Sequence, residues 1–181
     1  MERIFGKPII DQEEMYKRIR DLGRQIARDY EGRDLLLVGV LKGAFAFYAD
    51  LARAIQLPLR VDFLVVTSSK DQAKKSGKVK VVSDLTEDIK GRDVLLVEDI
   101  VDSGLTVSYL KKVLWAKRPR SLKVCTLLDK PERRKVKVAV DYIGFSIPDK
   151  YVVGYGLDYQ NKYRNLPYIA VLDVSEELDE G

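Results

Sequence analysis

VLLVEDIVDSGLT, residues 94–106, is the stretch that decides the fold and points to a site. It begins as an aliphatic run, which is typical of a strand buried in a parallel sheet. The run ends in two adjacent acids, Glu98 and Asp99, and a third acid, Asp102, follows closely. Small and hydroxylated residues come next and open a helix, whose unpaired N–H groups attract anions. Because open α/β sheets bind ligands at the carboxyl ends of their strands, the segment predicts acids beside a phosphate cradle. An ordinary strand–turn–helix with a polar cap is the alternative, but such a turn does not need these acids.

Strands and helices alternate on both sides of this segment. We expect helices at 12–30, 43–56 and 104–117, and strands or short apolar strand-like segments at 34–41, 59–66, 78–82, 94–99, 121–129, 140–147, 151–159 and 166–172. Residues 67–77 are polar and lack periodicity, so we predict a loop there. This order is typical of an α/β fold with a parallel sheet covered on both faces, and the terminal segments would form a small cap.

The composition excludes several classes of protein and site. The chain has 181 residues, no histidine and one cysteine, Cys125, so Ser-His-Asp sites, histidine-dependent zinc motifs and internal disulfides are excluded. Acid–base chemistry must therefore use Asp, Glu, Lys or Tyr. A net charge of +4 suits a substrate with several phosphates. The lone cysteine and the absence of an apolar span or signal-peptide core favour a cytoplasmic protein that does not enter a membrane.

VEDIVDSGLT resembles the motif with which the type I phosphoribosyltransferases bind 5-phosphoribosyl-1-pyrophosphate (PRPP). Its sequence is most similar to the form of this motif in the hypoxanthine-guanine enzymes. LLDKPERRK, residues 127–135, and YVVGYGLDYQNKYRNLPYI, residues 151–169, are similar to two further stretches of that family. The resemblance implies one domain over 1–181 with the type I phosphoribosyltransferase fold. Its parts would be a mostly parallel core at roughly 30–140, a hood from about 1–11 and 148–175, and a lid at 67–77.

The resemblance also implies the reaction, in which a 6-oxopurine (hypoxanthine, guanine or xanthine) displaces pyrophosphate from PRPP with the help of Mg²⁺. It assigns the 5′-phosphate to Asp102, Ser103, Gly104, Leu105 and Thr106. It assigns the ribose hydroxyls and their Mg²⁺ to Glu98 and Asp99, and a second Mg²⁺ to Asp158. Because adjacent strand residues point to opposite faces, the sequence leaves open which of the first two acids contacts the ligand. Asp102 is the candidate general base.

The remaining roles implied by the resemblance concern pyrophosphate and the purine. Pyrophosphate would meet Lys42, Gly43 and Arg164, and the peptide bond before Lys42 can be cis. Lys130 would donate to the purine O6, Tyr151 would stack on the ring, and the backbone of Val152 would read its edge. Arg133, Arg134, Lys135 and Lys137 are interpreted as a solvated basic face.

The lid differs from its relatives, since Ser68 and Ser69 stand where the family usually has Ser-Tyr. An alternative function is a nucleotide-sensing RNA-binding regulator on the same fold, of the pyrimidine attenuation type. A phosphoribosyltransferase for another base is a third reading. We expect no nucleic acid partner and a homodimer or homotetramer. The sequence leaves open the choice among 6-oxopurines, how the lid closes, and regulation by guanine nucleotides.

Overall fold

A central six-stranded sheet organises the computed structural model, which describes residues 8–69 and 78–172. Its strands are β1 (Leu35–Leu41), β2 (Arg60–Ser69), β3 (Lys78–Ser83), β4 (Asp93–Val101), β5 (Ser121–Asp129) and β6 (Tyr142–Ser146). They lie in the order β3-β2-β1-β4-β5-β6, and β3 alone among these six runs antiparallel to its neighbour. The predicted, mostly parallel α/β sheet is confirmed. Chain order reverses between β1 and β4, so their carboxyl ends border the crevice where such sheets bind ligands.

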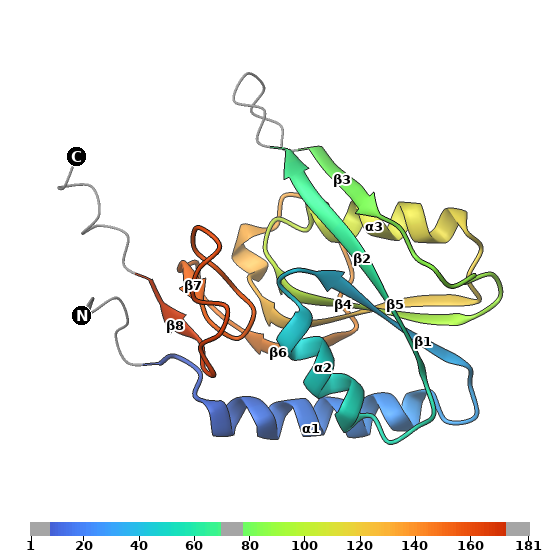
Figure 1. Cartoon of the computed structure of the whole chain (residues 1–181), viewed down its shortest axis with the longest axis horizontal. Helices are drawn as coiled ribbons and strands as arrows, with labels where there is room; N and C mark the ends of the chain where they lie inside the picture. Colours follow the sequence, from blue (N-terminus) through green and yellow to red (C-terminus); the bar gives the residue numbers. More distant parts are fainter. Residues whose placement is uncertain (1–7, 70–77, 173–181) are drawn as a thin grey trace.

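Helices cover both faces of the sheet (Figure 1). The helices are α1 (Gln12–Asp29), α2 (Phe45–Ala54) and α3 (Leu105–Ala116), with a 3₁₀ turn, η1, at Pro131–Arg133. Leu35 and Leu37 of β1 face one apolar cluster with α1 and α2. Leu36 and Val38 face the other cluster, with α3. Strand β1 is thus buried on both sides, which explains its continuous aliphatic sequence.

A two-stranded antiparallel sheet lies beside the amino-terminal end of α1 (Figure 1). It consists of β7 (Val152–Val153) and β8 (Ala170–Val171). Ile10 joins it through a bridge to Ile169. The segment around β7 and β8 therefore combines both ends of the described chain, in the part that the resemblance assigned to the hood. The flanking residues of the expected hood, 1–7 and 173–175, lie outside the described residues.

Strand β2 is longer than the sequence predicted. Its backbone pairs with β3 up to Ser69, which faces Lys78, and Ser68 faces Val79. The loop prediction at 67–77 was therefore wrong for its first three residues, because the ladder with β3 satisfies their backbone groups. The rest of that segment, 70–77, lies outside the described residues. Strand β4 likewise continues to Val101, which pairs with Asp129 of β5. Among the described helices, none has the length and apolar character that crossing a bilayer requires.

Candidate active site

The turn between β4 and α3 forms the cradle that the motif predicted. Asp102, Ser103 and Gly104 make the bend, and α3 begins at Leu105, so the first-turn N–H groups face outward at its start. Gly104 has φ of 80°, and a Cβ there would lie 2.9 Å from Cγ1 of Val138. Glycine is therefore required at this position by both backbone conformation and space.

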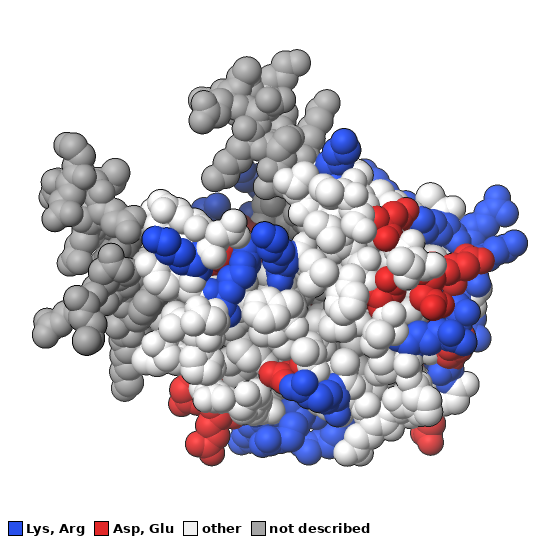
Figure 2. Space-filling model, viewed as in Figure 1, with Lys and Arg blue, Asp and Glu red and all other residues white. Residues whose placement is uncertain are grey.

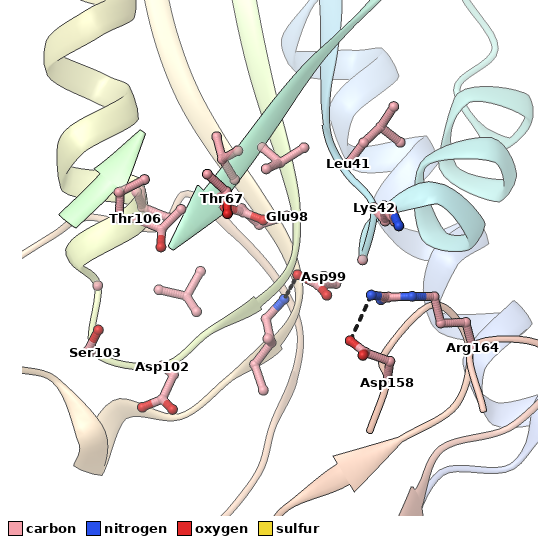
Figure 3. A pocket seen from close by; sticks show the side chains of 18 residues that line it. Leu41, Lys42, Thr67, Glu98, Asp99, Asp102, Ser103, Thr106, Asp158 and Arg164 are labelled. Atoms are coloured by element: carbon pink, nitrogen blue, oxygen red, sulfur yellow. Dashed lines mark hydrogen bonds and ion pairs between the residues drawn. The ribbon is translucent and has the colours of Figure 1, made fainter. Parts of the chain in front are cut away.

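A cavity of about 410 Å³ opens at this turn, at the carboxyl ends of β1 and β4 (Figure 3). We call it the phosphate-side cavity. Its lining includes most residues that the family resemblance assigns to PRPP and its metal ions: Lys42, Gly43, Glu98, Asp99, Asp102, Ser103, Gly104, Thr106, Asp158 and Arg164. Residues from the beginning, the middle and the end of the chain thus meet in one place. The predicted lid residues Ser68 and Ser69 lie at the end of β2, next to Thr67, which lines the cavity.

Glu98 and Asp99 both line this cavity, although they are neighbours on one strand. Glu98 is only 4% exposed. Burial, and secondarily the charge of Asp99, raise the pKa of the Glu98 carboxyl well above its usual range. Burial also raises the pKa of Asp99 from 3.8 to about 6, while the Arg164 guanidinium lowers it. The two acids therefore form a floor on which burial disfavours negative charge, and a bound cation would stabilise their charged forms.

The turn after β1 closes the other side of the cavity. The peptide bond between Leu41 and Lys42 is cis. A Cβ on Gly43 would lie 1.7 Å from Oδ2 of Asp99, and a Cβ on Gly156 would lie 2.1 Å from the Gly43 carbonyl oxygen. The 151–169 segment thus packs backbone to backbone against the β1–α2 turn, and the side-chain carboxylate of Asp99 on β4 packs against the same turn. That packing leaves no room for side chains at the two glycines.

Asp158 and Arg164 point toward one another at the mouth of the cavity (Figure 3). Their Oδ1 and Nη2 atoms are 2.8 Å apart. Nη1 of Arg164 also donates to the Gly156 carbonyl oxygen at 2.6 Å. This anchoring holds a guanidinium, whose fork matches phosphate oxygens, at the edge of the site.

A second cavity of about 430 Å³ adjoins the first, and we call it the base-side cavity. Asp99, Ile100, Asp102 and Asp158 line both cavities. The base-side cavity is lined by Lys130, Tyr151 and Val152, the three residues that the family resemblance assigns to the purine. Asp102 thus stands where the two cavities meet.

The lining of the base-side cavity includes both buried and exposed side chains. Lys130 is 7% exposed and its Nζ donates to the carbonyl oxygen of Lys150 at 2.7 Å. Tyr151 is 48% exposed, meets the ring of Tyr159 edge-on at 5.7 Å, and its hydroxyl donates to the Asp158 carbonyl oxygen at 3.1 Å. A fixed ammonium donor and an aromatic face, available to a planar ligand, therefore belong to the same cavity.

The interpretation of Arg134 as part of a solvated basic face was wrong, whereas Arg133 is exposed, as expected. Arg134 donates through Nη1 to the carbonyl oxygens of Val101 and Asp102, at 2.7 and 2.5 Å, and pairs with the Asp129 carboxylate. These contacts fix the turn that carries the cradle. Arg133 does reach the surface, but its side chain contacts the candidate base, Asp102, at 3.0 Å.

Charge density alone could not identify these two arginines. The turn η1 folds the chain back after Lys130, so each arginine meets a carboxylate or carbonyl supplied by another segment. Lys135 and Lys137 are exposed, as expected.

Metal binding by the protein alone is not supported by the described part of the chain, in which no three Asp, Glu or Cys side chains come close enough to hold an ion. The carboxylates of the phosphate-side cavity could still supply one or two ligands each to an ion whose other ligands are phosphate oxygens and water. Mg²⁺ is usually bound in that way.

Comparison with known proteins relates this geometry to a family. The model of the phosphoribosyl transferase domain matches residues 7–160. Hypoxanthine phosphoribosyltransferase of Salmonella typhimurium is 48% identical, with 93% of this chain and 96% of the relative covered. The hypoxanthine-guanine phosphoribosyltransferase of Bacillus subtilis is 46% identical, with 95% and 96% covered. A crystal structure of a hypoxanthine-guanine phosphoribosyltransferase from Bacillus anthracis superimposes with a TM-score of 0.89 at 46% identity, over 93% of this chain and 99% of that one.

Proposed function

The chain belongs to the phosphoribosyl transferase family, and we propose that it transfers the phosphoribosyl group of PRPP to a 6-oxopurine in purine salvage, with hypoxanthine or guanine as acceptor and pyrophosphate as leaving group. The observation that carries this proposal is the pair of adjoining cavities, one with a phosphate cradle and the other with a buried lysine and an exposed aromatic ring. PRPP and a purine must meet at the anomeric carbon, so they need two such cavities side by side. The similarity to curated hypoxanthine and hypoxanthine-guanine enzymes supports the same activity.

PRPP would occupy the phosphate-side cavity. Its 5′-phosphate would accept from the backbone N–H groups at the start of α3 and from the hydroxyls of Ser103 and Thr106, with Gly104 and Leu105 completing the loop. The pyrophosphate would meet the Lys42–Gly43 turn and the guanidinium of Arg164. The ribose would lie between these two anion sites, near the acids of β4.

Asp102 would act as the general base. Nucleophilic displacement forms a bond between a ring nitrogen of the purine and C1′ of the ribose while the bond from C1′ to the pyrophosphate oxygen breaks. The purine then carries one proton too many, and a carboxylate where the two cavities meet can accept it. Histidine, the commonest general base, does not occur in this chain.

The purine would lie in the base-side cavity. Tyr151 offers a ring face for stacking, and the backbone of Val152 would contact the edge of the base. The Lys130 ammonium is held in place by its bond to the Lys150 carbonyl oxygen. It can donate to a 6-oxo group but would oppose the 6-amino group of adenine.

Mg²⁺ is the metal ion that this donor set fits. The floor acids Glu98 and Asp99 carry raised pKa values because burial costs their charged forms solvation, and a divalent cation would offset that cost. Asp158 would serve a second ion beside the pyrophosphate. When bound, Mg²⁺ neutralises the charge that develops on the leaving pyrophosphate.

Assembly into a homodimer or homotetramer is supported by an apolar surface on β2. The side chains of Val61 and Phe63 are 53% and 38% exposed on this strand. Figure 2 shows neutral side chains across the middle of this view, with basic and acidic groups around them. On the face shown in Figure 2, the mixture of signs does not form the continuous basic path that would favour RNA binding.

The proposed function also bears on the domain organisation, the lid and the cellular compartment. The chain would form one domain with a hood from its terminal segments, and the lid would span residues 67–77, which include Ser68 and Ser69. The single buried cysteine, Cys125, suits a reducing compartment such as the cytoplasm.

A panel of bases tests the function directly. The protein is incubated with PRPP, Mg²⁺ and hypoxanthine, guanine, xanthine or adenine, and released pyrophosphate is followed together with the nucleotide formed. We expect rapid release with hypoxanthine or guanine and little with adenine. Pyrophosphate release with none of the four purines, or with adenine only, would refute the proposal.

A further inference from the structure

Four charged side chains of alternating sign line one wall of the base-side cavity: Asp102, Arg133, Asp149 and Lys130. Nε of Arg133 lies 3.0 Å from Oδ1 of Asp102, and its Nη1 lies 2.9 Å from Oδ2 of Asp149. Nζ of Lys130 lies 3.8 Å from Oδ1 of Asp149. One guanidinium therefore bridges the candidate base and a carboxylate that also faces the lysine.

The ion pairs of Arg133 with Asp102 and Asp149 are too exposed to contribute much to the stability of the fold. The Arg133 side chain is 47% exposed, and Asp102 and Asp149 are 39% and 48% exposed. Ion pairs of this kind contribute little to the free energy of unfolding, because water screens them. A guanidinium that forks between two carboxylates does, however, fix their orientation, since its donors lie in one rigid plane.

Arg133 is itself held on both sides. Its backbone N–H donates to the Lys130 carbonyl oxygen at 3.1 Å, in the turn η1. Its Nη1 is anchored on Asp149, which immediately precedes Lys150, the residue whose carbonyl oxygen holds Lys130. The bridge thus ties the carboxylate of Asp102 to the segment that fixes the lysine donor.

We propose that Arg133 is a positioning residue for Asp102, with Asp149 as its anchor. By holding Oδ1, the guanidinium leaves Oδ2 of Asp102 to accept the proton from the purine. The inference rests on the proposed function, because it assumes that Asp102 is the base. Small errors in the placement of such a group are costly in turnover, whereas the binding of PRPP in the other cavity does not depend on it.

The test uses Arg133→Gln, Arg133→Lys and Asp149→Asn in the full chain, with Lys137→Ala as a control. Lys137 is an exposed cation a few residues further on, and it is absent from the lining of the base-side cavity. For each variant, kcat and the KM values for hypoxanthine and PRPP are measured, and thermal unfolding verifies the fold. We expect Arg133→Gln to lower kcat about tenfold with the KM for PRPP unchanged. Arg133→Lys should restore part of the loss, Asp149→Asn should lower kcat less, and Lys137→Ala should behave like the wild type.

Measuring the same substitutions in a protein that lacks the base distinguishes a positioning role from a general structural role. In Asp102→Asn protein, Arg133→Gln should cause no further loss of kcat, because the group that it positions no longer takes the proton. An equal tenfold loss in both backgrounds, or an unchanged kcat in the Arg133→Gln single variant, would overturn the inference. If Arg133→Gln does not fold, Arg133→Lys and Asp149→Asn are compared in the two backgrounds in the same way. Wild-type protein that releases no pyrophosphate with any purine would instead refute the proposed function, so the two failures are distinguishable.

Discussion

Gly43 and Asp99 lie so close together that a Cβ on the glycine would be 1.7 Å from Oδ2 of the aspartate. The turn after β1 and the acid on β4 are therefore in direct contact, although 56 positions separate them in the chain. We propose that the turn binds pyrophosphate and that the acid binds the ribose and its metal ion. Their contact would then hold the two halves of the proposed PRPP site at a fixed distance.

Gly43→Ala should lower kcat/KM for PRPP by about 10²-fold or more, because the added methyl must displace either the turn or the carboxylate. Gly91→Ala is the matched control. Gly91 has φ of 70° and no neighbouring atom within 4 Å of its would-be Cβ. Alanine there should cost about 1 kcal/mol of stability and leave kcat/KM unchanged. Near-normal activity of Gly43→Ala would mean that the close contact has no bearing on PRPP.

Lys130→Ala should lower kcat/KM for hypoxanthine and guanine by about 10²-fold or more while the KM for PRPP stays near the wild-type value. The ammonium is buried and hydrogen-bonded to the Lys150 carbonyl oxygen, so its two remaining N–H donors are held in place. Loss of such a matched donor is costly, and adenine should be a poor substrate of the wild type for the complementary reason. Steady-state kinetics with all three bases measure this. Equal use of adenine and hypoxanthine by the wild type would show that the lysine does not select the base.

Asp99→Asn should stabilise the metal-free protein at pH 7.5. Burial raises the pKa of Asp99 from 3.8 to about 6, so the folded chain binds this proton more tightly than the unfolded chain. Protonated Asp99 therefore makes its full contribution to the free energy of unfolding below about pH 4. This contribution is lost as the pH rises through 6. Removing the charge should therefore raise the free energy of unfolding at pH 7.5, by up to about 3 kcal/mol.

Urea unfolding in excess chelator at pH 4.5 and 7.5 measures this difference. The gap between Asp99→Asn and the wild type should be larger at the higher pH and should shrink when Mg²⁺ is added to the wild type. Glu31→Gln, a change at an exposed acid after α1, serves as the control. A gap that is independent of pH would contradict the assignment of the cost to burial of the Asp99 charge.

Asp158→Ala should raise the Mg²⁺ concentration needed for half-maximal activity, and an excess of chelator should abolish activity in the wild type. Asp158 pairs with Arg164 at the mouth of the phosphate-side cavity. Asp21→Ala is a suitable control, since Asp21 pairs with Arg24 three residues away on α1, outside both cavities. Activity titrated with Mg²⁺ distinguishes the variants. An unchanged Mg²⁺ requirement in Asp158→Ala would remove this residue from the proposed metal site.

Local chemistry explains why much of the fold was predictable from the sequence. Asp11 directly precedes the helix expected at 12–30, and it caps α1 by accepting from the backbone N–H of Glu14 at 2.8 Å. The aliphatic run before Glu98 forms a strand that is buried on both faces. In each case the determining residues lie within a few positions of one another, so their pattern is visible in one dimension.

The wall of the base-side cavity could not be predicted in the same way. Arg133 meets Asp102 across 31 positions and Asp149 across 16. No helical or strand periodicity connects these residues. They come into contact because the end of β4, the turn η1 and the segment before β7 lie close together in the fold. The same is true of the end of β2, where pairing with β3 converted an expected loop into strand.

Asp102→Asn tests most directly the central claim that Asp102 is the general base. Asp102 lines both cavities, so it should accept the proton that the purine loses as it bonds to the ribose. The substitution keeps the size and one acceptor oxygen, which Arg133 can still contact, but replaces the other oxygen, the proton acceptor, with a donor NH2 group. PRPP binding is measured by calorimetry and the turnover of hypoxanthine by pyrophosphate release on the same preparation. We expect PRPP affinity within a few-fold of the wild type and a turnover lower by about 10²-fold or more. Turnover near that of the wild type would show that the proton goes elsewhere, and the account of this site would then be wrong.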